Sequence, residues 1–398
     1  MQASMTLPLD GIRILDLSQV GLGPWATQIL GDFGADVIKL EVPGRGDLSR
    51  TFDPFLTEQN GQSAYFMASN RNKRSITIDL ELPEGRRLAK RLAAQVDVFV
   101  HNFRPGVAER LDLGYELLRE TNPRLVYAWG SGFGAGGPLV DRPGQDFLAQ
   151  SLSGVISRNR DVNGTPKILP TTISDYAAAL LIAQGVFLAL YHRERTGEGQ
   201  CVYVSLLDTL ISLQQMEAVQ LMLREKETDW VRNSLIGIVK TSDGALTLAG
   251  VFRPNPLADI CRALEIEDLS TRPEFSTLTL QRENKPTLWP LIEAAVAQFT
   301  TEEALQRFES NNVLCSPVWN LREALRHPQL TYNKTIVSFE DPVHGIVRAI
   351  GSPLKLSAMT EPPMRTPPRL GQHTDEVLAE FDLSRQDIAN LKSSGALG

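Results

Sequence analysis

Asp175 is the side chain in this sequence whose type and setting best suit covalent chemistry. It comes directly before the apolar run Tyr176–Tyr191, which predicts a buried helix. The positive end of a helix dipole favours an ionised carboxylate, and an ionised carboxylate can act as a nucleophile. The same position suits an ordinary helix cap, so the residues alone leave both roles open.

Glycines gather in two places where the backbone turns tightly or approaches another group. Five of the eight positions in Gly130–Gly137 are glycine, which indicates either a loop beside a bound group or a flexible connection.

The run Gly21–Ala26 has the form G-x-G-x-x-A, and Glu41 follows where a ribose-binding acid would stand. Pro24 removes an N–H that pyrophosphate would need, and no hydride-transfer site follows, so we expect neither nicotinamide nor flavin.

The composition is that of an ordinary globular protein. Among 398 residues, 42% are hydrophobic and 22% are charged, and the formal charge of −7 lacks the basic excess that nucleic acid would require. Cys201, Cys261 and Cys315 are too few and too scattered for a disulfide framework or a zinc site, and a reducing cytoplasm fits them best. We expect neither an export signal nor a membrane span.

Strand and helix signals alternate through the first half of the chain. A strand over Ile12–Leu17, a helical pattern over Trp25–Phe33 and a strand over Asp36–Leu40 predict a βαβ unit. Further strands are expected at Ile76–Leu80, Val98–Val100, Leu125–Trp129 and Gln200–Val204. This alternation predicts an α/β fold with a mostly parallel sheet that is covered by helices on both faces.

The pattern changes after the charged stretch at residues 224–227. A hairpin around residues 242–244, together with several helical stretches, predicts a smaller α+β domain over residues 226–330. A chain of 398 residues exceeds the usual size of one domain. We therefore expect either two domains or one large domain that carries a smaller inserted one.

Motifs spread over nearly the whole chain resemble those of the family III CoA-transferases, the group that includes formyl-CoA and carnitine CoA-transferases. In chain order they are residues 9–17 (LDGIRILDL), Gly23-Pro24, residues 34–41 (GADVIKLE), residues 70–76 (NRNKRSI), Asp79-Leu80, residues 97–106 (DVFVHNFRPG), residues 132–134 (GFG), residues 142–146 (RPGQD), Asp175, residues 193–200 and residues 370–374 (LGQHT). Their order and spacing match the family, so the resemblance does not depend on one short motif.

The resemblance implies a large Rossmann-like domain built from both ends of the chain, residues 1–225 and 331–398, around the smaller α+β domain. It also implies an interlocked homodimer, in which each active site lies between the large domain of one chain and the small domain of the other. Coenzyme A is the expected acyl carrier. The expected substrates are an acyl-CoA and a small carboxylic acid, with no nucleic acid or membrane partner.

The resemblance also implies roles for individual residues. Asp175 stands at the family's nucleophilic aspartate, which attacks a thioester to give an acyl-aspartyl anhydride that CoA thiolate can reopen. Asp146 matches a second acid, to which we assign proton handling or substrate orientation. The residues expected at the nucleotide of CoA are Asn102, Phe103 and Arg110, with Lys73 and Arg74 as further phosphate candidates. The residues expected near the acid substrate are Arg45, Arg50, Arg104 and Gln145, and no metal is expected.

Two other functions stay open. The α-methylacyl-CoA racemases share this fold but place a histidine beside the aspartate, where this chain has Gln145, which cannot act as a base at neutral pH. A non-catalytic acyl-CoA-binding relative would keep the fold without turnover, although Asp175 is retained.

Oxalate and formate are disfavoured as substrates, because Gly21-Leu22 replaces the glutamine-containing turn of the formyl-CoA branch and the extra glycine-rich loop of that branch is missing.

Overall fold

A computed structural model describes residues 7–56, 62–161, 163–227, 229–359 and 364–398 of the chain. The chain divides into two compact units, one formed by Met1–Gln214 with Thr331–Gly398 and the other by Gln215–Leu330. We expected the first boundary after residue 225. The observed division lies earlier, so that helix α10 (Gln215–Arg224) groups with the second unit.

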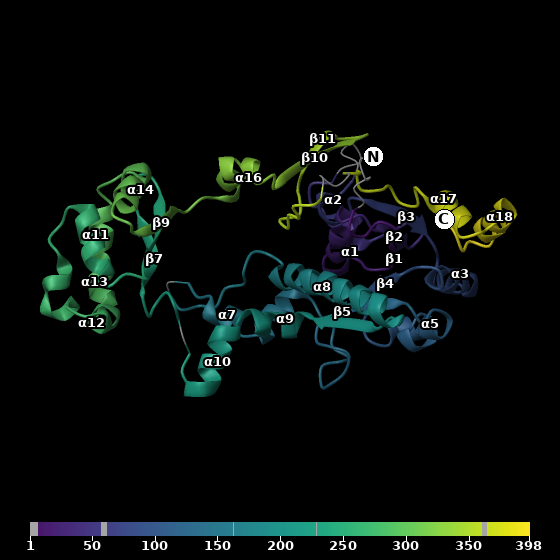
Figure 1. Cartoon of the computed structure of the whole chain (residues 1–398), viewed down its shortest axis with the longest axis horizontal. Helices are drawn as coiled ribbons and strands as arrows, with labels where there is room; N and C mark the ends of the chain where they lie inside the picture. The colour runs from purple at the N-terminus through teal and green to yellow at the C-terminus, as the bar shows by residue number, and fades with distance from the viewer. Residues whose placement is uncertain (1–6, 57–61, 162, 228, 360–363) are drawn as a thin grey trace. The chain divides into compact units, whose positions relative to one another are not determined.

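A six-stranded parallel sheet forms the centre of the first unit, with the strand order β3-β2-β1-β4-β5-β6 (Figure 1). Its strands are β1 (Arg13–Asp16), β2 (Asp36–Glu41), β3 (Lys73–Thr77), β4 (Val98–His101), β5 (Val126–Ser131) and β6 (Cys201–Ser205). Ile14 of β1 pairs with Val37 on one side and with Val98 on the other. The predicted mostly parallel α/β sheet is confirmed. Sheets with this strand order bind ligands at the carboxyl ends of their strands.

The two faces of this sheet bury separate apolar clusters. The helices of the unit are α1 (Leu22–Asp32), α2 (Ala64–Ser69), α3 (Pro83–Ala93), α4 (Val107–Arg110), α5 (Tyr115–Thr121), α6 (Asp146–Leu152), α7 (Val155–Arg158), α8 (Ile173–Thr196), α9 (Leu206–Leu213), α17 (Thr374–Glu380) and α18 (Arg385–Ser393). Ile14 packs with α1 and α8 on one face, whereas the next residue, Leu15, packs with α3, α17 and α18 on the other. This alternation is the two-residue period of a strand, and it confirms that helices cover both faces.

Helix α8 carries Asp175 near its start and lies along the sheet (Figure 1). By length and composition alone it could cross a membrane, a test that core helices of soluble proteins also pass. Its Ala178, Ile182 and Val186 are fully buried against α1 and the strands. The helix predicted for the apolar run is therefore confirmed, but only one of its faces is buried, since Leu180, Leu188 and Tyr191 are exposed.

Residues from the end of the chain cover the outer edge of the parallel sheet. The backbone N–H of His373 donates to the carbonyl of Ser75 in β3 at 2.9 Å. The backbone N–H of Asp79 donates to the carbonyl of Ala396 at 2.9 Å. Both ends of the chain thus build one unit, and the edge strand β3 is covered by the later of the two.

An antiparallel hairpin of β10 (Ile336–Asp341) and β11 (Gly345–Ile350) also belongs to the first unit, and the sequence analysis did not predict it. Short helix α16 (Pro328–Tyr332) stands at the boundary between the units. Neither element supplies a residue to the predicted site.

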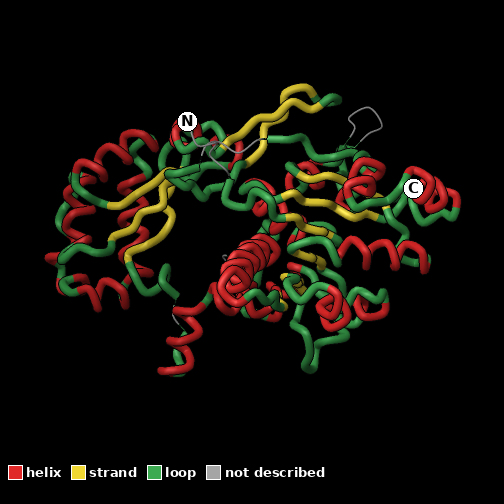
Figure 2. Tube along the Cα trace, turned by 45° about the vertical axis from the view of Figure 1, so that its right-hand side comes forward, coloured by secondary structure: helices red, strands yellow, loops and turns green. Residues whose placement is uncertain are grey.

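The second unit contains a three-stranded antiparallel sheet of β7 (Leu235–Lys240), β8 (Ala245–Gly250) and β9 (Leu314–Pro317). Its helices, seen beside the strands in Figure 2, are α10, α11 (Pro256–Leu264), α12 (Leu278–Glu283), α13 (Lys285–Val296), α14 (Thr301–Ser310) and α15 (Leu321–Ala324). Lys240 pairs with Ala245, so the hairpin predicted around residues 242–244 is confirmed.

Candidate functional site

The carboxylate of Asp175 lies beside the loop that joins β1 to α1. Asp175 is the third residue of α8 and the cap of that helix is Thr172, so Asp175 is not an ordinary helix cap. A Cβ atom added to Gly21, the residue before α1, would lie only 3.1 Å from Asp175 Oδ2. The carboxylate is therefore close to the first turns of two helices, α1 and α8, whose dipoles favour negative charge.

Asp146 organises the start of α8 from the neighbouring helix α6. Its Oδ1 accepts hydrogen bonds from the backbone N–H of Ser174 at 2.7 Å and from that of Asp175 at 3.3 Å. Its Oδ2 accepts one from Gln150 Nε2 at 2.6 Å, and the residue is 1% exposed. Because both oxygens are occupied by these donors, the geometry favours the orienting role over proton handling.

The pKa of Asp175 is displaced in the direction opposite to our expectation. Burial of the carboxyl group, and then the nearby charge of Asp146, raise the pKa of Asp175 from 3.8 to about 7. The two helix dipoles act the other way, but they do not overcome the lost hydration. The side chain is still partly exposed, and no described residue donates a hydrogen bond to its carboxylate. At neutral pH this carboxyl group is therefore partly protonated and partly ionised. No described residue binds it through a hydrogen bond.

The glycine-rich segment folds back on the residues before Asp146. A Cβ atom added to Gly132 would lie 2.3 Å from the Cα of Gly144, so the two glycines pack backbone against backbone. The loop that follows β5 is thereby fixed beside Gln145, whose side chain is exposed. This contact needs glycine at both positions, which supports the interpretation of an ordered loop beside a bound group.

A cavity of about 170 Å³ opens at the carboxyl ends of β1, β2 and β4. Phe103 and Arg45 line it, together with Ser18, Gln19 and Val107 among others. A smaller cavity of about 50 Å³ lies on the other side of Phe103 and reaches Arg104 and the segment Ser131–Gly134. Phe103 thus lines both the cavity at the strand ends and the cavity beside the glycine-rich loop.

Asn102, which is half-buried, stabilises this edge of the sheet. Its Oδ1 accepts from the backbone N–H of Gln19 at 2.9 Å, and its Nδ2 donates to the carbonyl of the same residue at 2.7 Å. The side chain therefore holds the β1–α1 loop. One N–H and one lone pair of this amide are not used by these two bonds, so the expected contact with the nucleotide stays a prediction.

Lys73 and Arg74 are engaged in the protein itself. The Lys73 ammonium is buried and donates to Asp16, to the carbonyl of Pro24 and to Asn70 at 3.1, 2.8 and 2.9 Å, which uses all of its N–H groups. Arg74 donates to Asp36 and to two glutamates at the C-terminus. We therefore no longer expect either residue to bind the phosphates of CoA.

Arg50 is also removed from the set of substrate candidates. Its guanidinium donates to both carboxylate oxygens of Glu41, at 2.8 and 2.7 Å, and its Cζ lies 3.6 Å from the centre of the Phe66 ring. A guanidinium that is held in a bidentate pair of this kind has few N–H groups left to bind a second carboxylate.

The other predicted cations are accessible. Arg45 and Arg104 are exposed at the rims of the two cavities. Arg110 is exposed on α4, and its Nη1 donates to the carbonyl of Gly106 at 3.2 Å. These three remain candidates for anionic groups of a ligand.

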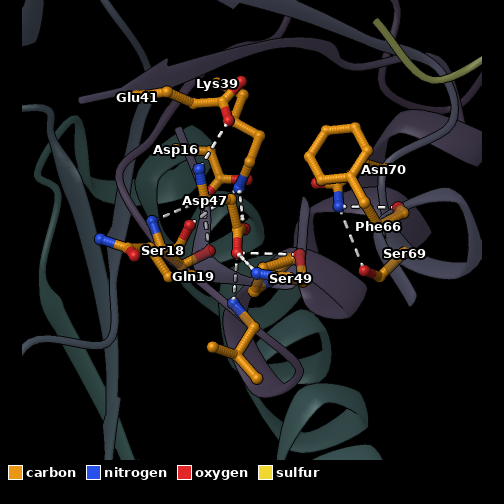
Figure 3. Close-up of polar contacts among 12 residues, drawn as sticks. Asp16, Ser18, Gln19, Lys39, Glu41, Asp47, Ser49, Phe66, Ser69 and Asn70 are labelled. Carbon is orange, nitrogen blue, oxygen red and sulfur yellow. Dashed lines mark hydrogen bonds and ion pairs between the residues drawn. The ribbon is translucent and has the colours of Figure 1, made fainter. Parts of the chain in front are cut away.

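A buried polar network beneath the β1–α1 loop escaped the sequence analysis (Figure 3). Lys39 Nζ lies 2.9 Å from Asp47 Oδ2, and Lys73 Nζ lies 3.1 Å from Asp16 Oδ2, with all four side chains fully buried. Burial alone would raise the pKa of Asp16, but the charges of Lys73 and Lys39 outweigh it and lower that pKa to about 2. The sequence did contain a signal for this network. Asp16 and Lys39 each lie inside an apolar strand pattern, and a buried charge requires a partner.

The chain is similar to known CoA-transferases over nearly its whole length. CoA-transferase family III matches residues 9–374. A succinyl-CoA:glutarate CoA-transferase of Homo sapiens is 32% identical over 396 residues, which cover 98% of this chain and 90% of the relative. A succinyl-CoA–D-citramalate CoA-transferase of Chloroflexus aurantiacus is 32% identical and covers 97% of each chain. The crystal structure of a CaiB/BaiF family protein from Brucella suis superposes with a TM-score of 0.84 at 29% identity, covering 95% of this chain and 100% of that one.

Proposed function

This chain belongs to CoA-transferase family III, an enzyme family that acts on CoA thioesters, and we propose that it moves CoA from an acyl-CoA to a free carboxylic acid through Asp175. The observation that carries this assignment is the position of the Asp175 carboxylate. It is partly exposed, lies against Gly21 and near two helix starts, and receives no hydrogen bond from a described residue. An acyl group that approached it would lie near the positive ends of the two helix dipoles, which favour the negative charge that develops on the carbonyl oxygen.

The proposed reaction exchanges one carboxylate for another without hydrolysis. Asp175 attacks the thioester carbonyl and expels CoA thiolate, which gives a mixed anhydride. The thiolate then attacks the Asp175 carbonyl of this anhydride, releases the donor acid and leaves an aspartyl-CoA thioester. The acceptor carboxylate attacks that thioester, and the released thiolate attacks the acceptor carbonyl of the second anhydride. The new acyl-CoA departs and the Asp175 carboxylate is restored.

The raised pKa of Asp175 gives this reaction a defined pH dependence. Only the ionised carboxylate is a nucleophile, so kcat/KM for the acyl-CoA should rise with pH and reach half of its maximum near the pKa of about 7. The measurement is kcat/KM between about pH 5.5 and about pH 8.5 with one acyl-CoA donor. A rate that does not change across this range would contradict either the shifted pKa or the nucleophile.

We propose that the nucleotide of CoA binds at the carboxyl ends of β1, β2 and β4. Phe103 is half-buried there and offers a ring to the adenine, while Arg45 and Arg104 at the cavity rims suit phosphate or carboxylate groups. The pantetheine arm would then follow the cavity beside Ser131–Gly134 toward Asp175.

Removal of the Phe103 ring should weaken CoA binding without slowing the chemical step. We expect Phe103→Ala to raise KM for the acyl-CoA about 10-fold, since an aromatic contact contributes roughly 0.5–1.5 kcal/mol beyond its buried area, and to leave kcat within about twofold. Phe103→Leu is the matched control, because it keeps apolar volume without the ring and should give a smaller rise. An unchanged KM in the alanine variant would place the adenine elsewhere.

For the acid substrate we propose a small dicarboxylate, whose second carboxylate would pair with Arg104, which lines the cavity beside the glycine-rich loop. Succinyl-CoA is named as the substrate of both transferases described above, which supports this class. We also propose an interlocked homodimer in the cytoplasm. Light scattering during gel filtration measures the molecular mass and so tests the dimer.

The decisive experiment is a screen of acyl-CoA donors against free acids, with new thioesters detected by mass spectrometry. Transfer to at least one dicarboxylate supports the proposal. Binding of CoA without exchange would favour a non-catalytic relative. Proton exchange next to the thioester in deuterated water, with no acceptor acid present, would favour a racemase, although Gln145 offers no base for it.

A further inference from the structure

Val20 adopts a backbone conformation that its side chain disfavours, directly beside the proposed nucleophile. Its φ angle is 68°, in the left-handed region that glycine enters freely and β-branched residues rarely enter. The next residue, Gly21, is the one whose added Cβ would lie 3.1 Å from Asp175 Oδ2. A conformation of this kind persists only where the surroundings hold it, and such residues concentrate at functional sites.

Asp47 supplies the contact that holds Val20. Its Oδ1 accepts a hydrogen bond from the backbone N–H of Val20 at 3.0 Å and another from Ser49 N–H at 2.8 Å. Its Oδ2 lies 2.9 Å from Lys39 Nζ, and neither side chain is exposed to solvent. Figure 3 shows Asp47 between Lys39 and Ser49. The carboxylate is thus fixed by a buried cation on one side and fixes the loop on the other.

The two residues before Val20 are held in the same way. Lys39 Nζ also donates to the carbonyl of Ser18 at 2.8 Å, and Asn102 bonds both the N–H and the carbonyl of Gln19. Each residue of the Ser18–Val20 loop is therefore bound by a side chain from another part of the sheet edge.

We propose that Asp47, oriented by Lys39, is a positioning residue: it keeps Val20 in the left-handed conformation and thereby keeps Gly21 at its short distance from Asp175. This inference rests on the proposed role of Asp175. A loop that relaxed at Val20 would move the first turn of α1 relative to the carboxylate, and a displacement of that kind slows the chemical step more than it weakens CoA binding.

The first test separates positioning from stability. Asp47→Leu leaves Lys39 buried without its partner, so it should lower both the melting temperature and kcat. The double variant Lys39→Met/Asp47→Leu replaces the pair by apolar groups, which restores stability in many proteins. We expect its melting temperature to exceed that of Asp47→Leu but to stay below wild type, because the N–H groups of Val20 and Ser49 still lack their acceptor, while kcat stays at least about 30-fold below wild type with KM within about threefold. Recovery of kcat together with the melting temperature would overturn the proposal.

A second test changes Val20 alone and leaves Lys39 and Asp47 in place. Val20→Pro removes the N–H that donates to Asp47 and forbids a positive φ, so kcat should fall at least about 30-fold and the melting temperature should fall with it. Val20→Gly keeps the N–H and the conformation, so it should stay within about threefold of wild type. Near-normal kcat in the proline variant would overturn the proposal.

Two controls complete the design. The variant Arg71→Met/Asp32→Leu replaces another buried ion pair of the same unit, away from Asp175, and should leave kcat unchanged. Asp175→Asn tests the nucleophile independently. If Asp175→Asn turns over normally, the proposed function fails. If only the Asp47 and Val20 variants behave as wild type, the positioning role fails and the function stands.

Discussion

Asp175→Asn should lose at least about 10³-fold of transferase activity while the protein stays folded and still binds CoA. The amide has the shape of the carboxylate, but it cannot form the acyl anhydride, so the covalent route is closed. The measurement is the rate of thioester exchange with the best donor and acceptor pair, together with CoA binding by calorimetry. Wild-type rates in this variant would refute the nucleophile assignment.

The same variant should be more stable than the wild type at high pH. A carboxyl group whose pKa is about 7 in the folded protein and 3.8 as a free side chain favours folding below pH 3.8, and this contribution is lost as the pH rises through 7. Asparagine does not ionise, so it avoids that loss. The melting temperature of Asp175→Asn should exceed that of the wild type at about pH 8, and the gap should narrow toward about pH 5.

Asp146→Ala should damage both the fold and the reaction. It leaves the N–H of Ser174 and the amide of Gln150 without their buried acceptor, which costs about 3 kcal/mol of unfolding free energy. The first turn of α8 then loses its anchor, and a shift of Asp175 should lower kcat about 100-fold. Thermal unfolding and steady-state kinetics measure the two effects.

Asp146→Asn is the matched control for that prediction. Its Oδ1 can still accept from Ser174, so the loss of stability should be smaller than in the alanine variant. Its charge is gone, and that charge is one of the causes that raise the pKa of Asp175. The pH at which kcat/KM reaches half of its maximum should therefore fall below about 7. An unchanged midpoint would show that Asp146 does not act on Asp175 through its charge.

Local patterns were sufficient to predict the sheet and the buried helix. The alternation of strand and helix signals predicted the six parallel strands, although β3 lies at Lys73–Thr77 and not at the expected Ile76–Leu80. The turn at 242–244 predicted the β7–β8 hairpin, because such patterns depend on a few neighbouring residues. The position of Asp175 at the start of α8 followed from the apolar run after it. The direction of its pKa shift did not, because burial depends on what packs over the carboxyl group from elsewhere in the chain.

For the cationic residues, too, the sequence does not reveal contacts with residues that are distant along the chain. Lys73 looked like a phosphate ligand, yet its partner Asp16 lies 57 residues away in sequence. Arg74 pairs with Glu380, 306 residues away. No short motif records such pairs, so sequence could place these residues near the sheet edge but could not tell a free cation from a paired one. The role of Asp47 was invisible for the same reason, since its importance lies in contacts with Lys39 and Val20.

The cover over strand β3 has a consequence for how this protein is made. The residues that bond to Ser75 and Asp79 are His373 and Ala396, which leave the ribosome after the whole of the second unit, and the second unit is one continuous stretch of chain. During synthesis the second unit can therefore fold first, while strand β3 of the parallel sheet still lacks the C-terminal residues that cover it. Nascent chains that stop before the C-terminal helices should accordingly be protease-sensitive in the sheet and resistant in the second unit.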